Sequence, residues 1–144
     1  MEKYNYFTDE SKTEHNQDEF LEKPILPVIL AISGYRGFED YDFIHDKIKK
    51  YHEDYNIAEI IVGDCRGTDK LAVQIAKDLC IQCTIYPANW LKYGLKAGPL
   101  RNMQLYENST HGMAFLSDLS KGTLHFVNTF LKNDKPITIY RTEK

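Results

Sequence analysis

The sequence predicts an α/β fold of three layers, in which helices cover both faces of a mainly parallel five-stranded sheet. Two observations lead to this fold class. Short runs of aliphatic residues recur along the chain without alternating with polar ones, as in strands buried on both faces. Longer segments with apolar residues at helical spacing separate these runs. Strands joined by helices form a parallel sheet with right-handed crossovers, so we expect a Rossmann-like sandwich.

Each element of this sheet has its own signal in the sequence. The first strand is expected at 28–32, where five aliphatic residues stand together before Ser33 and Gly34. Pro99 suits the first turn of the third helix, because its fixed φ angle favours that position. In chain order we expect strand 28–32, helix 40–55, strand 59–62, helix 68–79, strand 83–86, helix 99–107, strand 112–116, helix 123–132 and strand 137–140.

The chain divides into a short acidic segment and one domain. Residues 1–23 carry seven acidic and three basic side chains and few aliphatic ones, so we expect a flexible leader there. An interaction arm is the alternative, because Tyr4, Tyr6 and Phe7 can pack on a partner. The remainder, 24–144, has the length of a single domain.

Charge and composition exclude several classes of protein. The whole chain has a net charge of −3, which argues against a protein that binds a track of nucleic acid. The leader accounts for this excess, so the nearly neutral body remains compatible with one small phosphorylated ligand. No apolar run approaches the roughly 20 residues of a membrane span.

The three cysteines fit a reduced, cytoplasmic protein without a metal centre. Cys65, Cys80 and Cys83 cannot all pair within one chain, and the first residues lack a secretory signal pattern. Cys80 and Cys83 have a C-x-x-C spacing, but a zinc site needs two further ligands. The sequence therefore predicts structural thiols, and neither a metal nor a cofactor.

The loops that follow the expected strands carry the candidate binding residues. In such sheets ligands bind beyond the carboxyl ends of the strands, where the strand order reverses. These loops combine glycine, which allows close approach of the backbone, with arginine, lysine or hydroxyl groups suited to phosphate. The expected ligand-binding residues are Ser33, Gly34, Tyr35, Arg36, Gly63, Asp64, Arg66, Gly67, Asp69, Asn89, Trp90, Gly98, Pro99, Arg101, Asn102, Ser117, Asp118, Ser120, Lys121, Gly122 and Thr123. The chain has neither Gly-x-Gly-x-x-Gly after the first strand nor a Gly-Lys-Ser/Thr loop, which excludes the usual dinucleotide enzymes and P-loop proteins.

Four of these segments resemble motifs of one family. The run 63–72, Gly-Asp-Cys-Arg-Gly-Thr-Asp-Lys-Leu-Ala, resembles Gly-Gly-x-Arg-Gly-Ala-Asp-x-Leu-Ala. Pro-Ala-Asn-Trp at 87–90 and Ala-Gly-Pro-Leu-Arg-Asn at 97–102 resemble its Pro-Ala-Asp-Trp and Ala-Gly-Pro-x-Arg-Asn. Ser-Gly-Tyr-Arg at 33–36 and the Ser-Lys-Gly-Thr that ends at Thr123 are looser matches. The family is the SLOG superfamily, in the branch named YspA or circularly permuted YpsA-related, and the resemblance covers residues 28 to 141.

The resemblance implies a pocket for a nucleotide or a nucleotide-derived ligand. Some SLOG proteins sense nucleotide signals in antiviral defence, whereas the related LOG enzymes cleave a nucleoside monophosphate with an arginine and a glutamate. Arg101 stands where that arginine would be and is the candidate catalytic residue. His125 stands about where the glutamate would be, which puts cleavage by the LOG mechanism in doubt.

Three functions therefore remain open. The first is a module that binds and senses or sequesters a nucleotide-derived ligand. The second is a hydrolase that uses Arg101 with a substitute carboxylate, for which Asp64, Asp69 and Asp118 are available. The third is an interaction subunit that works through the acidic leader. A homo-oligomer also stays open, as in related proteins.

Three candidate residues have alternative structural roles. Asp69 is expected to brace the following helix at least as much as to bind a ligand. Trp90 suits either stacking on a base or packing on the neighbouring helix. Tyr35 suits stacking on a base or covering the pocket.

Overall fold

The computed structural model describes residues 5–8 and 27–142. The helices of the described chain are α1 (Tyr41–Tyr55), α2 (Thr68–Asp78), α3 (Trp90–Tyr93), the 3-10 helix η2 (Gly94–Lys96), α4 (Ala97–Glu107) and α5 (Lys121–Lys132). The strands are β1 (Asn5–Thr8), β2 (Val28–Gly34), β3 (Ile57–Val62), β4 (Gln82–Ile85), β5 (His111–Leu116) and β6 (Ile137–Arg141).

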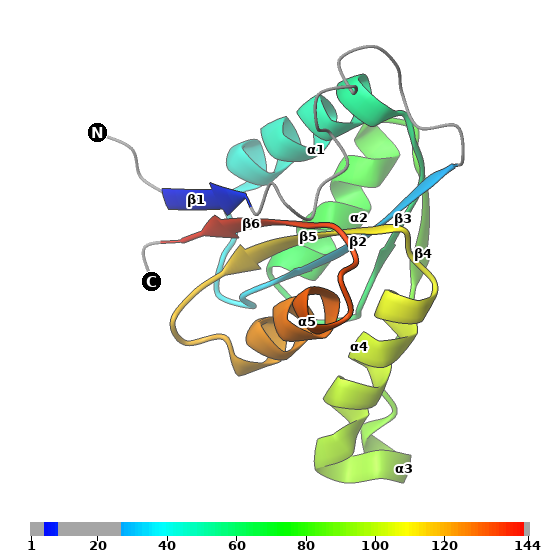
Figure 1. Ribbon diagram of the computed structural model, residues 1–144, viewed down its shortest axis with the longest axis vertical. Coiled ribbons are helices and arrows are strands. Elements are labelled where there is room, and N and C mark those ends of the chain that lie inside the picture. Colours follow the sequence, from blue (N-terminus) through cyan, green and yellow to red (C-terminus); the bar gives the residue numbers. More distant parts are fainter. Residues whose placement is uncertain (1–4, 9–26, 143–144) are drawn as a thin grey trace.

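The strands form one sheet in the order β1-β6-β5-β2-β3-β4 (Figure 1). The five strands from β2 to β6 run parallel to their neighbours, which confirms the expected α/β fold class. The sequence did not predict β1, which pairs antiparallel with β6 from Asn5 opposite Arg141 to Thr8 opposite Thr138. The rest of the expected leader lies outside the described residues.

Helices cover both faces of the sheet because the side chains of each strand alternate between two apolar cores. From β2, Leu30 and Ile32 point to one core and Ala31 to the other. The first core receives Ile44 and Ile48 of α1 together with residues of α2. The second receives Leu105 of α4 and the buried face of α5. Both cores exclude water from the strands, which explains why the strand segments are continuously aliphatic.

Helix α3 and η2 were not expected from the sequence. They connect β4 to α4 and, with the first part of α4, project beyond the sheet (Figure 1). Asn89 begins α3, because its side-chain oxygen accepts a hydrogen bond from the Lys92 amide at 3.1 Å. The helix expected at 99–107 therefore begins two residues earlier, at Ala97, and Pro99 lies in its first turn.

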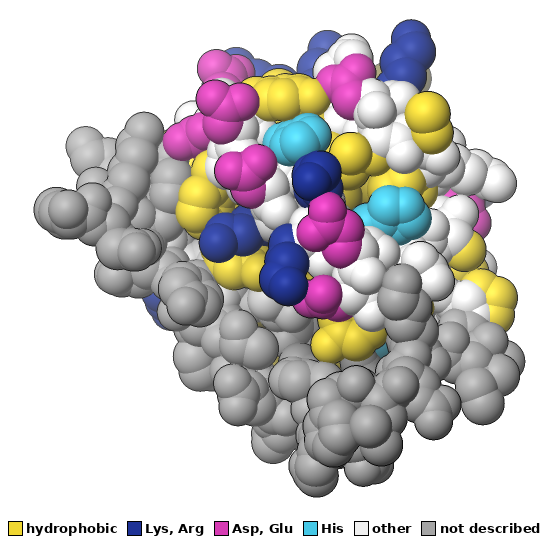
Figure 2. Space-filling model, turned by 90° about the horizontal axis from the view of Figure 1, so that it is seen from above, with side chains coloured by type: hydrophobic (Ala, Val, Ile, Leu, Met, Phe, Trp, Pro, Cys, Tyr) yellow, Lys and Arg dark blue, Asp and Glu magenta, His cyan; other side chains and the backbone are white. Residues whose placement is uncertain are grey.

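The exposed side of α1 carries charges of both signs. Lys49 pairs with Glu53 at 2.9 Å and Lys50 with Asp54 at 3.2 Å. Figure 2 shows acidic and basic side chains interspersed on this face of the described chain. None of the helices formed by residues 27–142 is long and apolar enough to cross a membrane.

Candidate functional site

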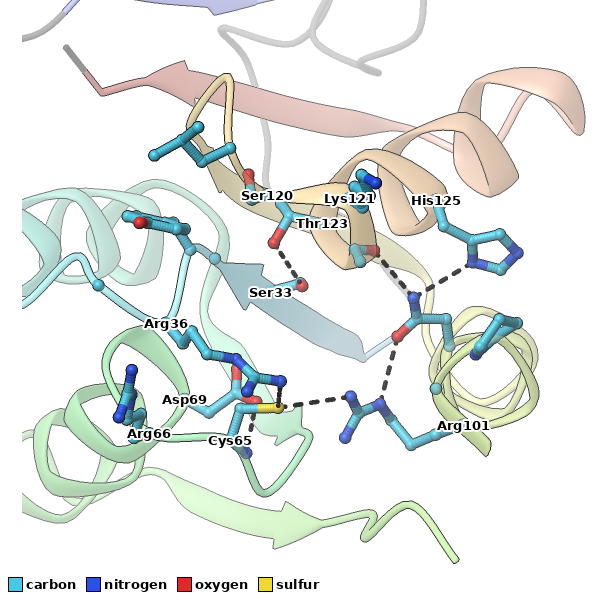
Figure 3. Close-up of a pocket in the computed structure, with 18 of the residues that line it drawn as sticks. Ser33, Arg36, Cys65, Arg66, Asp69, Arg101, Ser120, Lys121, Thr123 and His125 are labelled. Atoms are coloured by element: carbon cyan, nitrogen blue, oxygen red, sulfur yellow. Dashed lines mark hydrogen bonds between the residues drawn. The ribbon is translucent and has the colours of Figure 1, made fainter. Parts of the chain in front are cut away.

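A pocket of about 660 Å³ lies at the carboxyl end of β2 (Figure 3). The chain passes from β2 to β3 and β4 on one side of the sheet and places β5 and β6 on the other. The strand order therefore reverses at β2, which is where such sheets bind ligands. Loops that follow β2, β3 and β5 line the pocket together with residues of α3, η2 and α4.

Most of the residues expected from the sequence line this pocket. They are Ser33, Gly34, Tyr35, Arg36, Arg66, Asp69, Trp90, Gly98, Pro99, Arg101, Asn102, Ser120, Lys121, Gly122 and Thr123. Sequence reasoning did not include five further lining residues, which are Gly37, Cys65, Leu95, Leu119 and His125. Three of these five, Gly37, Cys65 and Leu119, stand beside or between residues that were expected, so the sequence identified the loops better than the individual side chains that line the pocket.

The remaining expected residues lie outside the lining and have other partners. Gly63 and Asp64 support Arg101, as described below, and Gly67 lies under the carbonyl group of Arg36. Asn89 caps α3, and Asp118 lies 3.6 Å from Arg141. Ser117 is buried, and its hydroxyl accepts a hydrogen bond from the Leu119 amide at 3.1 Å.

The N-terminus of α5 forms one wall of the pocket. Ser120 begins the helix, but its hydroxyl accepts from the Ser117 amide at 2.9 Å and donates to the Ser117 carbonyl at 2.7 Å. No side chain caps α5, so the first amides of the helix are available to a ligand at the end that attracts anions. A Cβ atom on Gly122 would stand in open space, so this part of the wall permits close approach.

The hydroxyl groups of Ser33 and Thr123 link this wall to β2. Their oxygen atoms lie 3.4 Å apart, with Ser33 near the end of β2 and Thr123 in the first turn of α5. Thr123 is buried, and both residues line the pocket. The pair thus holds the N-terminus of α5 against the strand at the switch point.

The opposite wall carries arginine side chains around Cys65 (Figure 3). The Cys65 Sγ atom lies 3.7 Å from Nη2 of Arg36 and 3.8 Å from Nη2 of Arg101. Arg36 and Arg66 are exposed, whereas Arg101 is only 8% exposed. Two guanidinium groups from distant parts of the chain therefore converge on one point of the pocket.

Arg101 is held in place by a set of acceptors beneath the pocket. Its Nη1 atom donates to Oδ1 of Asp64 at 3.3 Å and to the Tyr86 carbonyl at 3.4 Å, and Nε donates to Oδ1 of Asn102 at 3.2 Å. A Cβ atom on Gly63 would overlap Nη1 of Arg101. The glycine after β3 thus makes room for the guanidinium group, which is a supporting role.

Asn102 connects Arg101 to the α5 wall. Its Nδ2 atom donates to the Gly122 carbonyl at 3.1 Å and to Nδ1 of His125 at 3.2 Å (Figure 3). Because an amide nitrogen only donates, Nδ1 of His125 accepts, and the neutral ring carries its proton on Nε2. Burial, and secondly Lys132, lower the pKa of His125, which favours this neutral form.

Asp69 is a buried carboxyl group in the arginine wall. It is 5% exposed, and its Oδ2 atom accepts from the Cys65 amide at 3.1 Å. Burial raises its pKa from 3.8 to about 6, while that hydrogen bond and the Arg101 charge oppose the rise. Asp69 therefore braces the loop after β3, whereas the sequence led us to expect a brace for the following helix, and it also presents a carboxyl group to the pocket.

The loop after β2 folds closely against the loop after β3. Gly67 has a φ of +75°, and a Cβ atom there would overlap the carbonyl group of Arg36. The Tyr35 ring lies over Gly37, where a Cβ atom would come within 2.6 Å of it. The hydroxyl of Thr68 donates to the Tyr35 carbonyl at 3.2 Å, which joins the two loops.

Large apolar side chains form the rim of the pocket. Trp90 is 48% exposed, Leu95 92% and Leu119 66%, and all three line the pocket. A Cβ atom on Gly98 would stand 3.4 Å from the Trp90 ring, so the ring also packs on the start of α4. The pocket therefore joins cationic walls to an apolar rim.

These features define a Rossmann-like α/β domain with a cationic pocket at its topological switch point. Residues 28–93 match the family described as YspA, cpYpsA-related SLOG family, so this part of the chain is similar to that family. Over this range the match confirms the resemblance expected from the sequence, which extended to residue 141. No curated protein and no solved structure matches the chain.

Proposed function

We propose that the pocket binds a nucleotide or a nucleotide-derived, phosphorylated small molecule, as a module that senses or sequesters it. One observation carries this proposal, which is the uncapped N-terminus of α5 beside Lys121 and an open position at Gly122. Helix amides and a lysine favour an anionic group such as phosphate. The exposed Trp90 and Leu95 at the rim suit the flat, weakly polar base of a nucleotide.

The size of the pocket agrees with a ligand of this kind. Its volume of about 660 Å³ falls within the range of about 300–1,000 Å³ typical of small-molecule sites. Ser33 and Thr123 offer hydroxyl groups beside the α5 amides. Similarity to the SLOG family over residues 28–93 supports the same ligand class.

The test begins with what the protein retains on purification. Mass spectrometry of small molecules released by denaturation should detect a phosphorylated, ultraviolet-absorbing compound. Calorimetric titration with ribonucleoside monophosphates and nucleotide sugars then measures affinity. Absence of a retained nucleotide together with absence of binding at millimolar concentration would overturn the proposal.

A matched pair of variants assigns binding to this wall. Gly122→Ala introduces a methyl group into the open position, so it should lower ligand affinity about tenfold or more while the fold persists. Leu124→Ala is the control, because this side chain is exposed in the same helix and lies outside the pocket lining. Equal affinities for the two variants would argue against a ligand at the α5 N-terminus.

A hydrolase is the second candidate, and Asp69 is the observation that favours it. A carboxyl group with a pKa of about 6 can donate or accept a proton near neutral pH, and Arg101 lies in the same wall. The mechanism would use Asp69 as the substitute carboxylate for the absent glutamate. Incubation with nucleoside monophosphates followed by chromatography tests it, and turnover that persists unchanged in Asp69→Asn would exclude this role.

A further inference from the structure

The cationic groups of the pocket lie on two sides of β2. Arg36 and Arg101 converge on Cys65 beside β3, with Arg66 in the same loop as Cys65, whereas Lys121 and the first turn of α5 follow β5 (Figure 3). β3 and β5 flank β2 in the sheet. Neighbouring strands are about 4.8 Å apart, so the ends of β3 and β5 are separated by about 10 Å. A ligand with a single phosphoryl group at the α5 N-terminus would leave the other side of the pocket, called the arginine side below, without an anion.

The arginine side has donors that lack a strong acceptor. The one hydrogen bond of the Arg36 guanidinium group to another described residue is with the Cys65 thiol, at 3.7 Å. Nη2 of Arg101 also points to this thiol, at 3.8 Å, although Nη1 and Nε of Arg101 have oxygen acceptors. A thiol is a weak acceptor, and guanidinium groups bind phosphate or carboxylate oxygens far more strongly. An anion placed beside Cys65 would satisfy both arginines.

The two sides are built independently, because they use different elements and different donors. The arginine side depends on side chains from the loops after β2 and β3 and from α4. The other side depends on backbone amides of α5 and on Lys121. Asp69, the carboxyl group of the lining, stands on the arginine side, where Arg36, Arg101 and Asp64 face it. With Arg66, three arginines stand there against the two carboxyl groups of Asp64 and Asp69, which leaves an excess of one positive charge when both carboxyl groups are ionised.

We propose that the ligand carries two separate anionic groups, one held by Arg36 and Arg101 and the other by the α5 N-terminus with Lys121. This inference rests on the proposed function and narrows its ligand class to nucleotides that carry two phosphoryl groups at separate positions. The central hydroxyl groups of Ser33 and Thr123 then face the part of the ligand that joins the two anions, because β2 lies between the two sides.

Calorimetric titration of the full chain with matched nucleotides tests this proposal. The probes are the four ribonucleoside 5′-monophosphates and the corresponding 3′,5′-bisphosphates, whose two phosphates stand on different ribose carbons, all at one ionic strength. The preferred 3′,5′-bisphosphate should bind about tenfold or more tightly than the monophosphate with the same base. Arg36→Ala and Lys121→Ala should each remove most of this preference, and circular dichroism verifies that both variants are folded.

Lys77→Ala is the control for charge alone, because this exposed lysine lies in the last turn of α2, outside the pocket lining. It should leave the preference unchanged. Monophosphates that bind as tightly as the doubly phosphorylated probes would overturn the two-anion proposal and leave the proposed function standing. A preference that survives either pocket substitution, or that Lys77→Ala reduces equally, would also overturn it. No binding of any probe would instead overturn the proposed function, and this inference with it.

Discussion

At the scale of single residues, several candidates turn out to act through another residue. Gly63 makes room for Arg101, and Asp64 accepts from its guanidinium group. Asn102 uses both of its amide hydrogens, on the Gly122 carbonyl and on His125. The sequence identifies the loops to which these residues belong, but only the structure separates the residues that line the pocket from those that hold the lining residues in place.

Gly67 offers a test of close packing between the loops after β2 and β3. Gly67→Ala should lower the free energy of unfolding by more than Gly94→Ala, measured by denaturant titration. Both glycines have positive φ with ψ near −130°, so backbone strain of about 1–3 kcal/mol applies to each. Only at Gly67 does the added methyl group overlap a backbone carbonyl, whereas Gly94 faces open space. Equal losses would show that the two loops do not meet as described.

Asp69 offers a test through pH. Its folded-state pKa of about 6 is above the ordinary 3.8, so between these values the folded protein binds more protons than the unfolded chain. The contribution of Asp69 to stability therefore falls as pH rises from about 4 to about 6, and is constant above. Relative to wild type, Asp69→Asn should be more stable at pH 7 than at pH 4, by an amount of the order of 2 kcal/mol. A difference between the two proteins that is independent of pH would contradict the buried, protonated carboxyl group.

At the scale of elements, the sequence predicted the buried strands well and the exposed helices poorly. The strands β2, β3 and β5 are recognisable because both of their faces are apolar. The segment that forms α3 and η2 contains Leu91 and Leu95, which are almost fully exposed, so burial gives no periodic signal there. In α5, Leu124 is 47% exposed, whereas Phe126 and Phe130 form the buried face of the helix. β1 was missed because its few strand-forming residues stand in an acidic segment.

Lys135 links the end of α4 to the start of β6 through hydrogen bonds. Its Nζ atom donates to the Tyr106 carbonyl at 2.6 Å and to the Ser109 carbonyl at 2.7 Å, and it lies 4.1 Å from the centre of the Tyr106 ring. Lys135→Met should lower the free energy of unfolding by about 1–3 kcal/mol, because two charge-assisted hydrogen bonds are lost. Lys132→Met, at an exposed position of α5, should change it by less than about 0.5 kcal/mol. Chemical denaturation of both variants checks this, and similar losses would contradict an anchoring role for Lys135.

At the scale of the whole molecule, the pocket and the β1 edge are separate parts of one sheet. Between β1 and the central strand β2 lie β6 and β5. The pocket is built from the loops at β2, β3 and β5, so its geometry does not depend on the N-terminal strand. The order of the strands could not be read from the sequence, since helical connections alone do not fix on which side each strand is added.

Removal of residues 1–8 tests this separation. The truncated protein should lose stability, because the backbone groups of β6 lose the partners that run from Asn5 to Thr8. Affinity for the ligand identified as above should stay within about twofold of the full chain, because the pocket residues are untouched. Thermal unfolding and calorimetric titration check the two expectations. A loss of affinity without a loss of stability would instead connect the N-terminal segment to ligand binding.

The rim tryptophan gives this protein an optical readout of its own. The chain contains one tryptophan, Trp90, which stands half-exposed where the apolar rim meets the cationic walls. When excitation is chosen so that the ten tyrosines do not absorb, the emission comes from this single ring and depends on the polarity around it. A ligand that binds against the rim should quench the Trp90 fluorescence or shift its wavelength. Binding of a library of metabolites can therefore be screened without a dye or label.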